Sequence, residues 1–325
     1  MSHNSPVVYI NHKPRLFTGS PYFGEMFLKQ ARKQGKKVYF WKRKPLPELV
    51  LVIDWTLELE RLKYYREKEV KIVQRIDGAG IKYSRAPEKD NLIYQTYNYV
   101  DAVIFQSQFC QQVWKRAFAL NKPSYIILNG ADERVFSREG KKESFPFKKV
   151  IVTASRWRPW KGLEQMIEVF LALRRDDVGF VILGELKKAG IKIPDHPGII
   201  TTGKVSHKKM AEIFRGADLF LYLAWHDWCP KVVSQALVCG LPVICLGKGG
   251  TRELVGDCGI ILRGEKDQDL DWWGENRVNI KEAVEAINTL LEQGKKIPPR
   301  PDLYLSTMVR KYFEVFEKVL DEARG

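Results

Sequence analysis

Short apolar runs, rich in β-branched and aromatic residues, alternate along this sequence with longer stretches in which apolar residues recur at helical spacing. This alternation is typical of parallel β-sheets whose strands are joined by helices. Runs that are apolar throughout, such as LFLYL at 219–223, fit strands that helices cover on both faces. The predicted strands are Val7–Ile10, Val38–Trp41, Leu49–Ile53, Lys71–Gln74, Ala102–Gln106, Tyr125–Leu128, Val150–Thr153, Gly179–Leu183, Ile199–Thr202, Leu219–Leu223, Pro242–Leu246 and Cys258–Leu262.

A charged, turn-prone segment, SREGKKESFPFKK at 137–149, separates the first six predicted strands from the last six. A chain of 325 residues has room for two domains, each with a core of its own. We therefore predict an α/β fold of two Rossmann-like domains, residues 1–145 and 146–304, with parallel sheets facing across a cleft. Ligands of such sheets bind outside the carboxyl ends of the strands. Two amphipathic helices are expected near the end of the chain, at Ile280–Glu292 and Ser306–Glu322.

The charge is distributed unevenly: residues 1–150 carry +13 of the formal net charge of +15, and residues 151–325 carry +2. A basic half attracts an anionic partner, which here is nucleic acid, an anionic membrane face or a phosphate-bearing acceptor. No apolar run approaches the roughly 20 residues that span a bilayer, and the N-terminus lacks the blocks of a signal peptide. Five cysteines without a C-x-x-C pair indicate reduced thiols that mostly pack. These features predict a cytoplasmic protein.

The segment TASRWRPWKGLEQ, which starts at Thr153, places cations directly after a predicted strand. A short turn carries Arg156, Arg158 and Lys161, and an apolar-periodic helix is expected to open at Lys161–Gly162. Cations at the carboxyl end of a strand, beside helix N–H groups, form an anion site. The alternative is that three basic residues simply lie on an exposed loop, and the spacing alone leaves both open.

The segment WHDWCPKVVSQALVCG at 225–240 follows another predicted strand. Pro230 is expected at the first position of a helix, where its missing N–H costs nothing, and Gly240 at the helix end. Asp227 precedes this helix and Gln235 lies eight residues later, so both side chains are expected to reach one polyhydroxyl ligand. A further loop, Lys248-Gly249-Gly250-Thr251, offers exposed N–H groups after the next strand.

These segments together resemble the donor-binding domain of the GT-B retaining glycosyltransferases, specifically glycosyltransferase family 4. In this domain the matching residues are Ser155-Arg156, Lys161-Gly162, Asp227, Gln235-Ala236, Gly240-Leu241-Pro242, Gly249-Gly250 and Glu253. The likeness extends over most of the chain, and the matching residues before this domain are Gly19, Gln106-Ser107-Gln108-Phe109, Asn129-Gly130-Ala131-Asp132 and Phe136. The resemblance implies a GT-B fold in which residues 1–145 bind the acceptor and 146–304 bind the donor. It also implies that a final helix, 305–325, crosses back onto the first domain.

The function implied by the resemblance is transfer of a hexose or another sugar from a nucleotide diphosphate sugar, such as a UDP sugar, to a hydroxyl of a glycan or lipid-linked acceptor. By resemblance, the catalytic residues are Arg156, Lys161, Asp227 and Asp77, of which Asp77 contacts the acceptor. The donor-binding residues are Gly19, Gly184, Lys204, Val205, His226, Trp228, Cys229, Pro230, Lys231, Val232 and Gln235. The implied mechanism is front-face attack with assistance from the leaving phosphate, so no metal or other cofactor is expected.

Two residues depart from the family pattern. Gln235 stands where a ribose-contacting Glu is expected, and Asp227 replaces the commoner Glu. A Gln carbonyl also accepts from ribose hydroxyls, but a neutral hydrogen bond is about half as strong as a charge-assisted one. The alternatives are a working enzyme with altered donor preference and a catalytically silent sugar-nucleotide binder. We favour the enzyme, because Arg156 and Lys161 remain.

Several of these residues can also be explained by a structural role alone. A lone Asp77-Gly78 pair is often only a turn, and the acidic residues at 267–271 are read as a surface loop rather than a metal site. No pair of histidines has the spacing of a metal cluster. The basic segment 29–44 is either a solvated helix end or a surface that docks on an anionic membrane. A nucleic-acid-binding protein is the remaining rival, but no helix-turn-helix or aromatic platform accompanies the basic segment.

Overall fold

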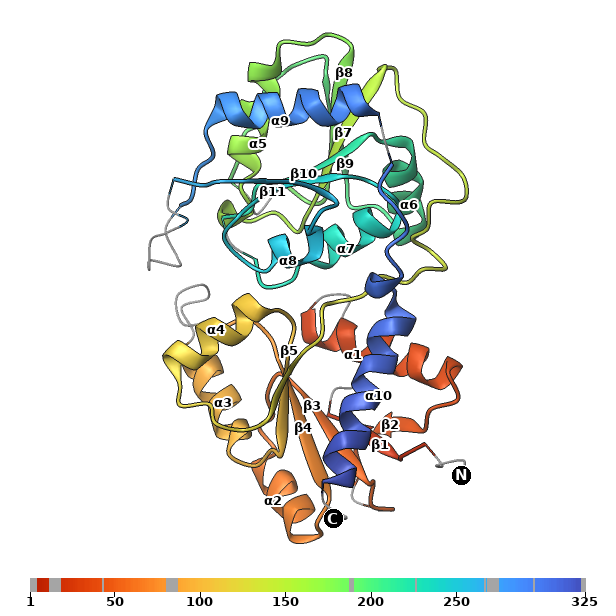
Figure 1. Cartoon of the computed structure of the whole chain (residues 1–325), viewed down its shortest axis with the longest axis vertical. Coiled ribbons are helices and arrows are strands. Elements are labelled where there is room, and N and C mark those ends of the chain that lie inside the picture. Colours follow the sequence, from red (N-terminus) through yellow and green to blue (C-terminus); the bar gives the residue numbers. More distant parts are fainter. Residues whose placement is uncertain are drawn as a thin grey trace. The chain divides into compact units, whose positions relative to one another are not determined.

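The computed structural model describes residues 5–11, 19–42, 44–79, 87–186, 190–225, 227–265, 267, 275–294 and 296–322. The chain divides into two compact units. The first comprises Met1–Leu128 together with Leu305–Gly325, and the second comprises Asn129–Tyr304. Each unit is a parallel sheet between two layers of helices, and each is described by itself (Figure 1).

The sheet of the first unit has the strand order β2-β1-β3-β4-β5-β6, with all described neighbours parallel. Its strands are β1 (Val8–Ile10), β2 (Val38–Phe40), β3 (Leu49–Ile53), β4 (Lys71–Ile76), β5 (Ala102–Phe105) and β6 (Ser124–Ile126). Every residue of β3 is buried, as expected for an apolar strand covered on both faces. The strand order reverses between β1 and β3.

Helices cover both faces of this sheet (Figure 1). They are α1 (Gly19–Lys33), α2 (Leu59–Glu67), α3 (Pro87–Tyr97), α4 (Gln108–Ala117) and α10 (Leu305–Asp321). Helices α1 and α10 lie side by side on one face, and α2, α3 and α4 lie on the other. Aromatic rings join α1 to α10: the ring of Phe27 lies 5.2 Å from that of Tyr312 and 6.4 Å from that of Phe316. The last helix of the chain is therefore part of the first unit's core.

The second unit repeats the architecture with the strand order β12-β11-β10-β7-β8-β9, again all parallel. Its strands are β7 (Lys149–Ala154), β8 (Val178–Leu183), β9 (Ile199–Gly203), β10 (Leu219–Tyr222), β11 (Val243–Leu246) and β12 (Gly259–Leu262). Helices α5 (Leu163–Leu173) and α9 (Ile280–Gln293) pack together on one face. Helices α6 (His207–Gly216), α7 (Lys231–Val238) and α8 (Thr251–Val255) lie on the other face (Figure 1). The strand order reverses between β7 and β10.

All twelve strands expected from the sequence are present, and each begins and ends within two residues of its predicted bounds. The helix starts differ slightly. A 3-10 turn, Pro159–Lys161, precedes α5, which begins at Leu163 rather than at Lys161–Gly162. Pro230 is the N-cap of α7 and not its first residue. The end of α7 is as expected, since Gly240 follows it with φ of 85°.

The boundary between the units lies at Leu128–Asn129, upstream of the expected position near residue 145. The expected linker packs on the second unit. Its backbone is bonded to that unit, because Glu143 N–H donates to the carbonyl of Glu212. Upstream of the expected linker, Ala131 N–H donates to the carbonyl of Leu303 in the same unit. The buried Arg215 donates to the carbonyl of Lys141 at 2.8 Å. The charged, turn-prone composition predicted a linker between the two domains, but these hydrogen bonds hold the segment on the second unit, where much of it is exposed.

All five cysteines are free and buried, in agreement with their reading as reduced thiols. Burial raises the pKa of both Cys239 and Cys245 to about 12, so each thiol is protonated at neutral pH.

Among the helices that the structure describes, none is long and apolar enough to cross a bilayer.

The packing of α10 leads to a stability prediction. Phe316 is fully buried among the rings of Phe27, Tyr312 and Phe313. We expect Phe316→Ala to lower the free energy of unfolding of the first unit by about 3–5 kcal/mol, because it leaves a cavity in that core. Guanidinium-induced unfolding of the full chain, followed by circular dichroism, measures the loss.

Glu314→Ala is the matched control on the same helix, since its side chain is half exposed. We expect this change to alter the free energy of unfolding by no more than about 0.5 kcal/mol. Equal effects of the two substitutions would show that α10 is not part of the core.

Candidate active site

The carboxyl edge of the second sheet gathers most of the residues expected to bind a ligand. Parallel strands all end at the same edge, so the loops after β7, β8, β9, β10 and β11 begin there. In open α/β sheets ligands bind where the strand order reverses, which in this unit is between β7 and β10. Lys161 follows β7 and Asp227 follows β10, so the two lie on opposite sides of this point.

The structure brings these two residues into contact. Lys161 Nζ forms a short ion pair with Asp227 Oδ2. The Tyr222 hydroxyl, at the end of β10, donates to the same carboxylate oxygen at 2.7 Å and accepts from Lys161 Nζ at 3.2 Å. The side chain of Lys161 is 19% exposed and that of Asp227 is 12% exposed. The sequence predicted separate roles for the two charges, one for phosphate and one for a hydroxylated ligand, whereas here they neutralise each other.

Gly162 makes this contact possible. Its φ is 67°, and a Cβ at this position would lie 2.0 Å from the carbonyl oxygen of Leu223, directly after β10. Only glycine lets the turn after β7 approach the end of β10 so closely. Gln165 reinforces the approach by donating to the Leu223 carbonyl at 2.7 Å, and Trp225 N–H donates to the carbonyl of Trp160.

Arg156, the other expected phosphate cation, lies in the same turn and is exposed. Its neighbour Trp157 is fully buried, and the indole N–H donates to the Leu183 carbonyl at 2.9 Å. Arg158 donates to the carbonyl of Trp157 at 2.8 Å. The buried ring fixes the turn on the sheet, which leaves Arg156 at the surface next to the end of β7.

The start of α7 is held by Asn129. Its side-chain amide donates to the Cys229 carbonyl at 2.8 Å, its backbone N–H donates to Cys229 Sγ at 3.3 Å, and its carbonyl accepts from Ser234 Oγ at 2.8 Å. Cys229 is thus a buried structural thiol. Pro230 is the N-cap of α7, and its side chain accepts no hydrogen bond from the N–H groups of the first turn. These N–H groups lie at the positive end of the helix dipole. Lys231 and Val232 form its first turn, and Trp228 N–H donates to Asp227 Oδ1 at 2.8 Å.

Gln235 lies on the same helix and is 7% exposed. In the part of the chain that the structure describes, its side-chain amide has no hydrogen-bond partner. Gln235 is a candidate ligand contact because it lies on the helix that follows β10, beside the point where the strand order reverses.

The remaining expected donor residues follow neighbouring strands. Gly184, after β8, has φ of 113°, and a Cβ there would lie 1.9 Å from the Ser155 carbonyl oxygen. Its N–H donates to the carbonyl of Gly203, the last residue of β9, and Lys204 and Val205 follow that strand. The Gly250 N–H donates to the Asp227 carbonyl at 2.7 Å, which joins the loop after β11 to the loop after β10.

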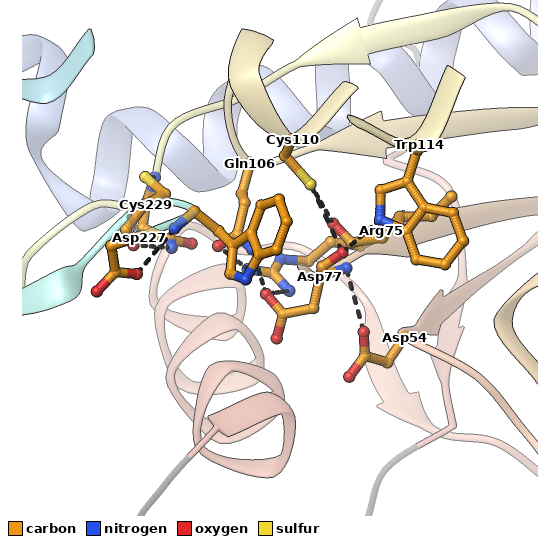
Figure 2. A network of polar contacts seen from close by, with 11 residues as sticks. Asp54, Arg75, Asp77, Gln106, Cys110, Trp114, Asp227 and Cys229 are labelled. Carbon is orange, nitrogen blue, oxygen red and sulfur yellow. Dashed lines mark hydrogen bonds and ion pairs between the residues drawn. The ribbon is translucent and has the colours of Figure 1, made fainter. Parts of the chain in front are cut away.

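A second polar cluster lies at the carboxyl edge of the first sheet (Figure 2). Asp77, just after β4, pairs with Arg75 Nη1 at 3.3 Å and accepts a short hydrogen bond from Gln106 Nε2. Its carbonyl accepts from the Trp114 indole at 2.9 Å and from Cys110 Sγ at 3.5 Å. Arg75 and Gln106 are buried, while the Asp77 side chain keeps 25% of its surface exposed. Asp77 is thus the exposed tip of a buried network and more than a simple turn residue.

Asp54 completes this cluster from the end of β3. It is 2% exposed and has φ of 67°, a left-handed conformation that costs a non-glycine residue about 1–2 kcal/mol. Its carboxylate accepts from the Asp77 N–H at 3.1 Å, and its carbonyl accepts from Gln74 Nε2 at 2.6 Å. The hydrogen bond from the Asp77 N–H to the Asp54 carboxylate therefore holds the loop that carries Asp77.

Three predictions concern residues outside these two clusters: Gly19, His226 and the acidic loop at 267–271. Gly19 is the first residue of α1, and His226 lies outside the described residues, as do positions 268–271 of the acidic loop. Asp267 accepts from Asn276 Nδ2 at 2.7 Å, which fits its reading as a loop residue. No group of three possible metal ligands occurs among the residues that the structure describes.

The sequence did not point to Tyr222, Arg75 or Asp54. Tyr222 lies inside the apolar run LFLYL, where a single hydroxyl is easily taken as part of the strand. Arg75 directly follows the predicted strand Lys71–Gln74, and β4 extends past it to Ile76. The polar residue directly after the buried run Leu49–Ile53 was a usable signal for Asp54. Asn129 was noted only as part of a matching segment, without a role.

Comparison with known proteins finds a family for the second unit. Residues 137–298 match the family model described as glycosyl transferases group 1. This segment belongs to the group 1 glycosyltransferases. It contains Arg156, Lys161, Asp227 and Gln235, so the part of the chain that matches the family is the unit with the Lys161–Asp227 pair.

Two curated relatives are similar over parts of the chain. An uncharacterized glycosyltransferase of Methanocaldococcus jannaschii is 26% identical over 195 residues, which cover 55% of this chain and 49% of that protein. A GDP-mannose-dependent alpha-mannosyltransferase of Mycolicibacterium smegmatis is 27% identical over 115 residues, 35% of this chain and 30% of that protein. The matched part of the chain thus covers half or less of the length of these two relatives.

Solved structures share the fold over nearly the whole chain. Anabaena HepE in complex with UDP-glucose has a TM-score of 0.67 at 14% identity, covering 96% of this chain and 99% of that one. Sucrose-phosphate synthase from Thermosynechococcus elongatus has a TM-score of 0.63 at 12% identity, covering 98% and 97%. With its two six-stranded parallel sheets, the protein has the GT-B fold.

The buried Arg75–Asp77 pair leads to a second stability prediction. We expect Arg75→Met to lower the free energy of unfolding by about 3–5 kcal/mol, because it leaves the partly buried Asp77 carboxylate without its cation. Guanidinium-induced unfolding measures the change. Arg66→Met is the matched control, because Arg66 is half exposed and its partner Asp101 keeps a second cation, Lys71, so the loss should be no more than about 1 kcal/mol. Equal losses would show that the Arg75 network does not support the first unit.

Proposed function

We propose that this protein is a retaining glycosyltransferase of the hexosyltransferase type, in family 4. It moves a sugar from a nucleoside diphosphate sugar to a hydroxyl of a glycan or lipid-linked acceptor. The observation that carries this proposal is the meeting of Lys161 and Asp227 at the reversal of strand order, inside the segment that belongs to the group 1 glycosyltransferases. A cation, a carboxylate and the Gln235 amide lie on the loops and the helix at the edge where an α/β sheet binds nucleotides.

The diphosphate is proposed to bind between Arg156, Lys161 and the start of α7. Arg156 is exposed and supplies a bidentate fork, while Lys161 supplies a point charge on a flexible stem. The N-terminal turn of α7 adds backbone N–H groups with a positive dipole end. These groups offset the negative charge that builds on the diphosphate as the sugar leaves.

The nucleoside and the sugar take the neighbouring positions. We assign the ribose hydroxyls to Gln235, the base to the backbone of Lys204 and Val205, and the transferred sugar to Asp227 and the turn of Trp228 and Cys229. Gly184 and Gly19 are proposed to let backbone approach the donor. The names of the relatives mention both GDP-mannose and UDP-glucose, so UDP and GDP sugars are the first donors to test.

The acceptor hydroxyl is assigned to the exposed face of Asp77. In the proposed reaction the bond between the anomeric carbon and the leaving phosphate oxygen breaks, and a bond to the acceptor oxygen forms on the same face. The acceptor proton passes to the leaving phosphate oxygen, and the cations stabilise the diphosphate product. This scheme uses no metal and no other cofactor.

A catalytically silent sugar-nucleotide binder is the alternative, and Gln235 is the observation that favours it. Its neutral amide forms weaker hydrogen bonds to ribose hydroxyls than the family's carboxylate does. A silent binder would be stabilised by nucleotides but would neither hydrolyse nor transfer the sugar.

The proposed function is tested first by thermal shift with UDP, GDP, ADP and their sugars, since a bound ligand raises the unfolding temperature by mass action. With the donor that binds, we expect Lys161→Ala and Arg156→Ala each to lower the turnover of donor hydrolysis or transfer about 10²- to 10³-fold. This is the usual effect of removing one preorganised donor to a developing charge.

Lys148→Ala is the matched control, because this exposed lysine precedes β7 at the opposite edge of the sheet. It should leave turnover unchanged. Activity indifferent to the loss of both Arg156 and Lys161 would remove the phosphate assignment. Binding without any turnover would favour the silent binder.

We further propose that the first unit docks on an anionic membrane face on the cytoplasmic side. Exposed cations flank β2, and among them Arg32 lies 5.6 Å from the ring of Tyr39, which is itself exposed together with Leu46. Cations that surround exposed apolar groups suit a negatively charged interface, where each Lys or Arg contributes about 1 kcal/mol. The exposed cations of this surface are Arg32, Lys33, Lys37, Lys42 and Lys44.

Sedimentation with neutral and anionic liposomes tests this docking. We expect the protein to sediment with anionic liposomes only, and the pair of changes Lys37→Glu and Lys42→Glu to weaken that binding at least tenfold. The pair Lys141→Glu and Lys142→Glu makes the same change in net charge on exposed lysines of the second unit and should have a much smaller effect. Equal partitioning onto neutral and anionic liposomes would end the idea.

A further inference from the structure

The buried hydroxyl of Tyr222 is a neutral group in the Lys161–Asp227 contact. Tyr222 is 1% exposed and ends β10, and its oxygen lies 2.7 Å from Asp227 Oδ2 and 3.2 Å from Lys161 Nζ. The hydroxyl therefore donates to the carboxylate and accepts from the ammonium group. Neither the family match nor the sequence pattern assigns a role to this residue.

The proposed function gives Lys161 a second task. Its charge is neutralised by Asp227, yet the same ammonium group is proposed to bind the diphosphate. When Lys161 turns to the phosphate, the carboxylate of Asp227 loses a charged partner while it stays largely buried. A buried charge without compensating hydrogen bonds is strongly unfavourable, so the release of Lys161 requires that other donors remain on Asp227.

Two such donors are present. Trp228 N–H donates to Asp227 Oδ1, and the Tyr222 hydroxyl donates to Oδ2. Tyr222 is held rigidly, because β10 lies between β7 and β11 and the Tyr222 ring stacks on Phe220 at 6.0 Å. Lys161, in contrast, carries its charge on a flexible four-carbon stem. Of the three side chains, the lysine is the one that can move.

We propose that Tyr222 is a positioning residue that keeps the Asp227 carboxylate hydrogen-bonded and in place while Lys161 exchanges Asp227 for the diphosphate of the donor. This inference rests on the proposed function, since it takes a nucleoside diphosphate as the ligand. Without the hydroxyl, Lys161 is the only side chain of this trio that can pair with Asp227 Oδ2. Its transfer to the phosphate then becomes less favourable, and the affinity for the nucleotide falls.

The test is calorimetric titration of the full chain with the nucleoside diphosphate that the unmodified protein binds. We expect Tyr222→Phe to weaken binding about tenfold, because hydrogen bonds to charged groups are among the stronger ones in proteins. Phenylalanine keeps the ring, so the packing on Phe220 remains. Tyr65→Phe is the matched control: Tyr65 is equally buried and its hydroxyl donates to the Lys42 carbonyl at 2.7 Å in the first unit. This control should leave the affinity unchanged.

A double-mutant cycle with Asp227→Asn separates positioning from a merely structural role. Asp227→Asn removes the charge that holds Lys161, so we expect it to bind the nucleoside diphosphate at least as tightly as the unmodified protein. In that background Tyr222→Phe should change the affinity less than twofold. Equal losses with and without Asp227 would overturn the inference, because the tyrosine would then act through the fold and not through the carboxylate.

The outcomes also separate the two proposals. If the unmodified protein binds no nucleoside diphosphate, the proposed function fails and this inference fails with it. If it binds and Tyr222→Phe binds equally well, only the positioning role of Tyr222 is overturned. Thermal unfolding of both phenylalanine variants checks that each is folded at the temperature of the titration.

Discussion

The site in the second unit depends on the ion pair between Lys161 and Asp227. The two residues are 66 positions apart and meet because β7 and β10 are neighbours in the sheet, with Gly162 allowing the loop after one strand to touch the end of the other. Both charges are largely buried, so each compensates the other. Any anion that uses Lys161 must therefore compete with Asp227, and the groups that stay on Asp227 decide how costly that exchange is.

The first unit uses the same physical arrangement with different residues. A buried cation, Arg75, and a partly exposed carboxylate, Asp77, stand at the carboxyl edge of its sheet, with Gln106 on the same carboxylate. In both units the loops at this edge carry polar groups because strand ends and helix starts leave backbone groups to be satisfied there. The family model matches 137–298, which lies within the second unit. Assignments on the first unit therefore rest on its own geometry.

Much of the fold was predictable, and the site was predictable in part. Strands such as Leu49–Ile53 are local apolar runs, and their bounds follow from composition alone. Arg156, Lys161 and Asp227 were singled out as candidates because charged residues follow such runs. The sequence did not predict that Lys161 pairs with Asp227, since this contact requires knowing which strands are neighbours. The boundary at Asn129 was missed for a similar reason, because hydrogen bonds to distant residues, rather than composition, attach the segment after it to the second unit.

The sequence by itself determined that this chain forms two parallel sheets with helices on both faces, because the alternation of apolar runs and helical spacing is a local property. It also determined which residues stand at the strand ends, and hence the candidate cations and carboxylates. Only the tertiary structure decided the strand order, which places the loop after β7 beside the loop after β10 and makes Tyr222 a partner of both charges. Strand order follows from packing between distant parts of the chain, and no local pattern of residues encodes it.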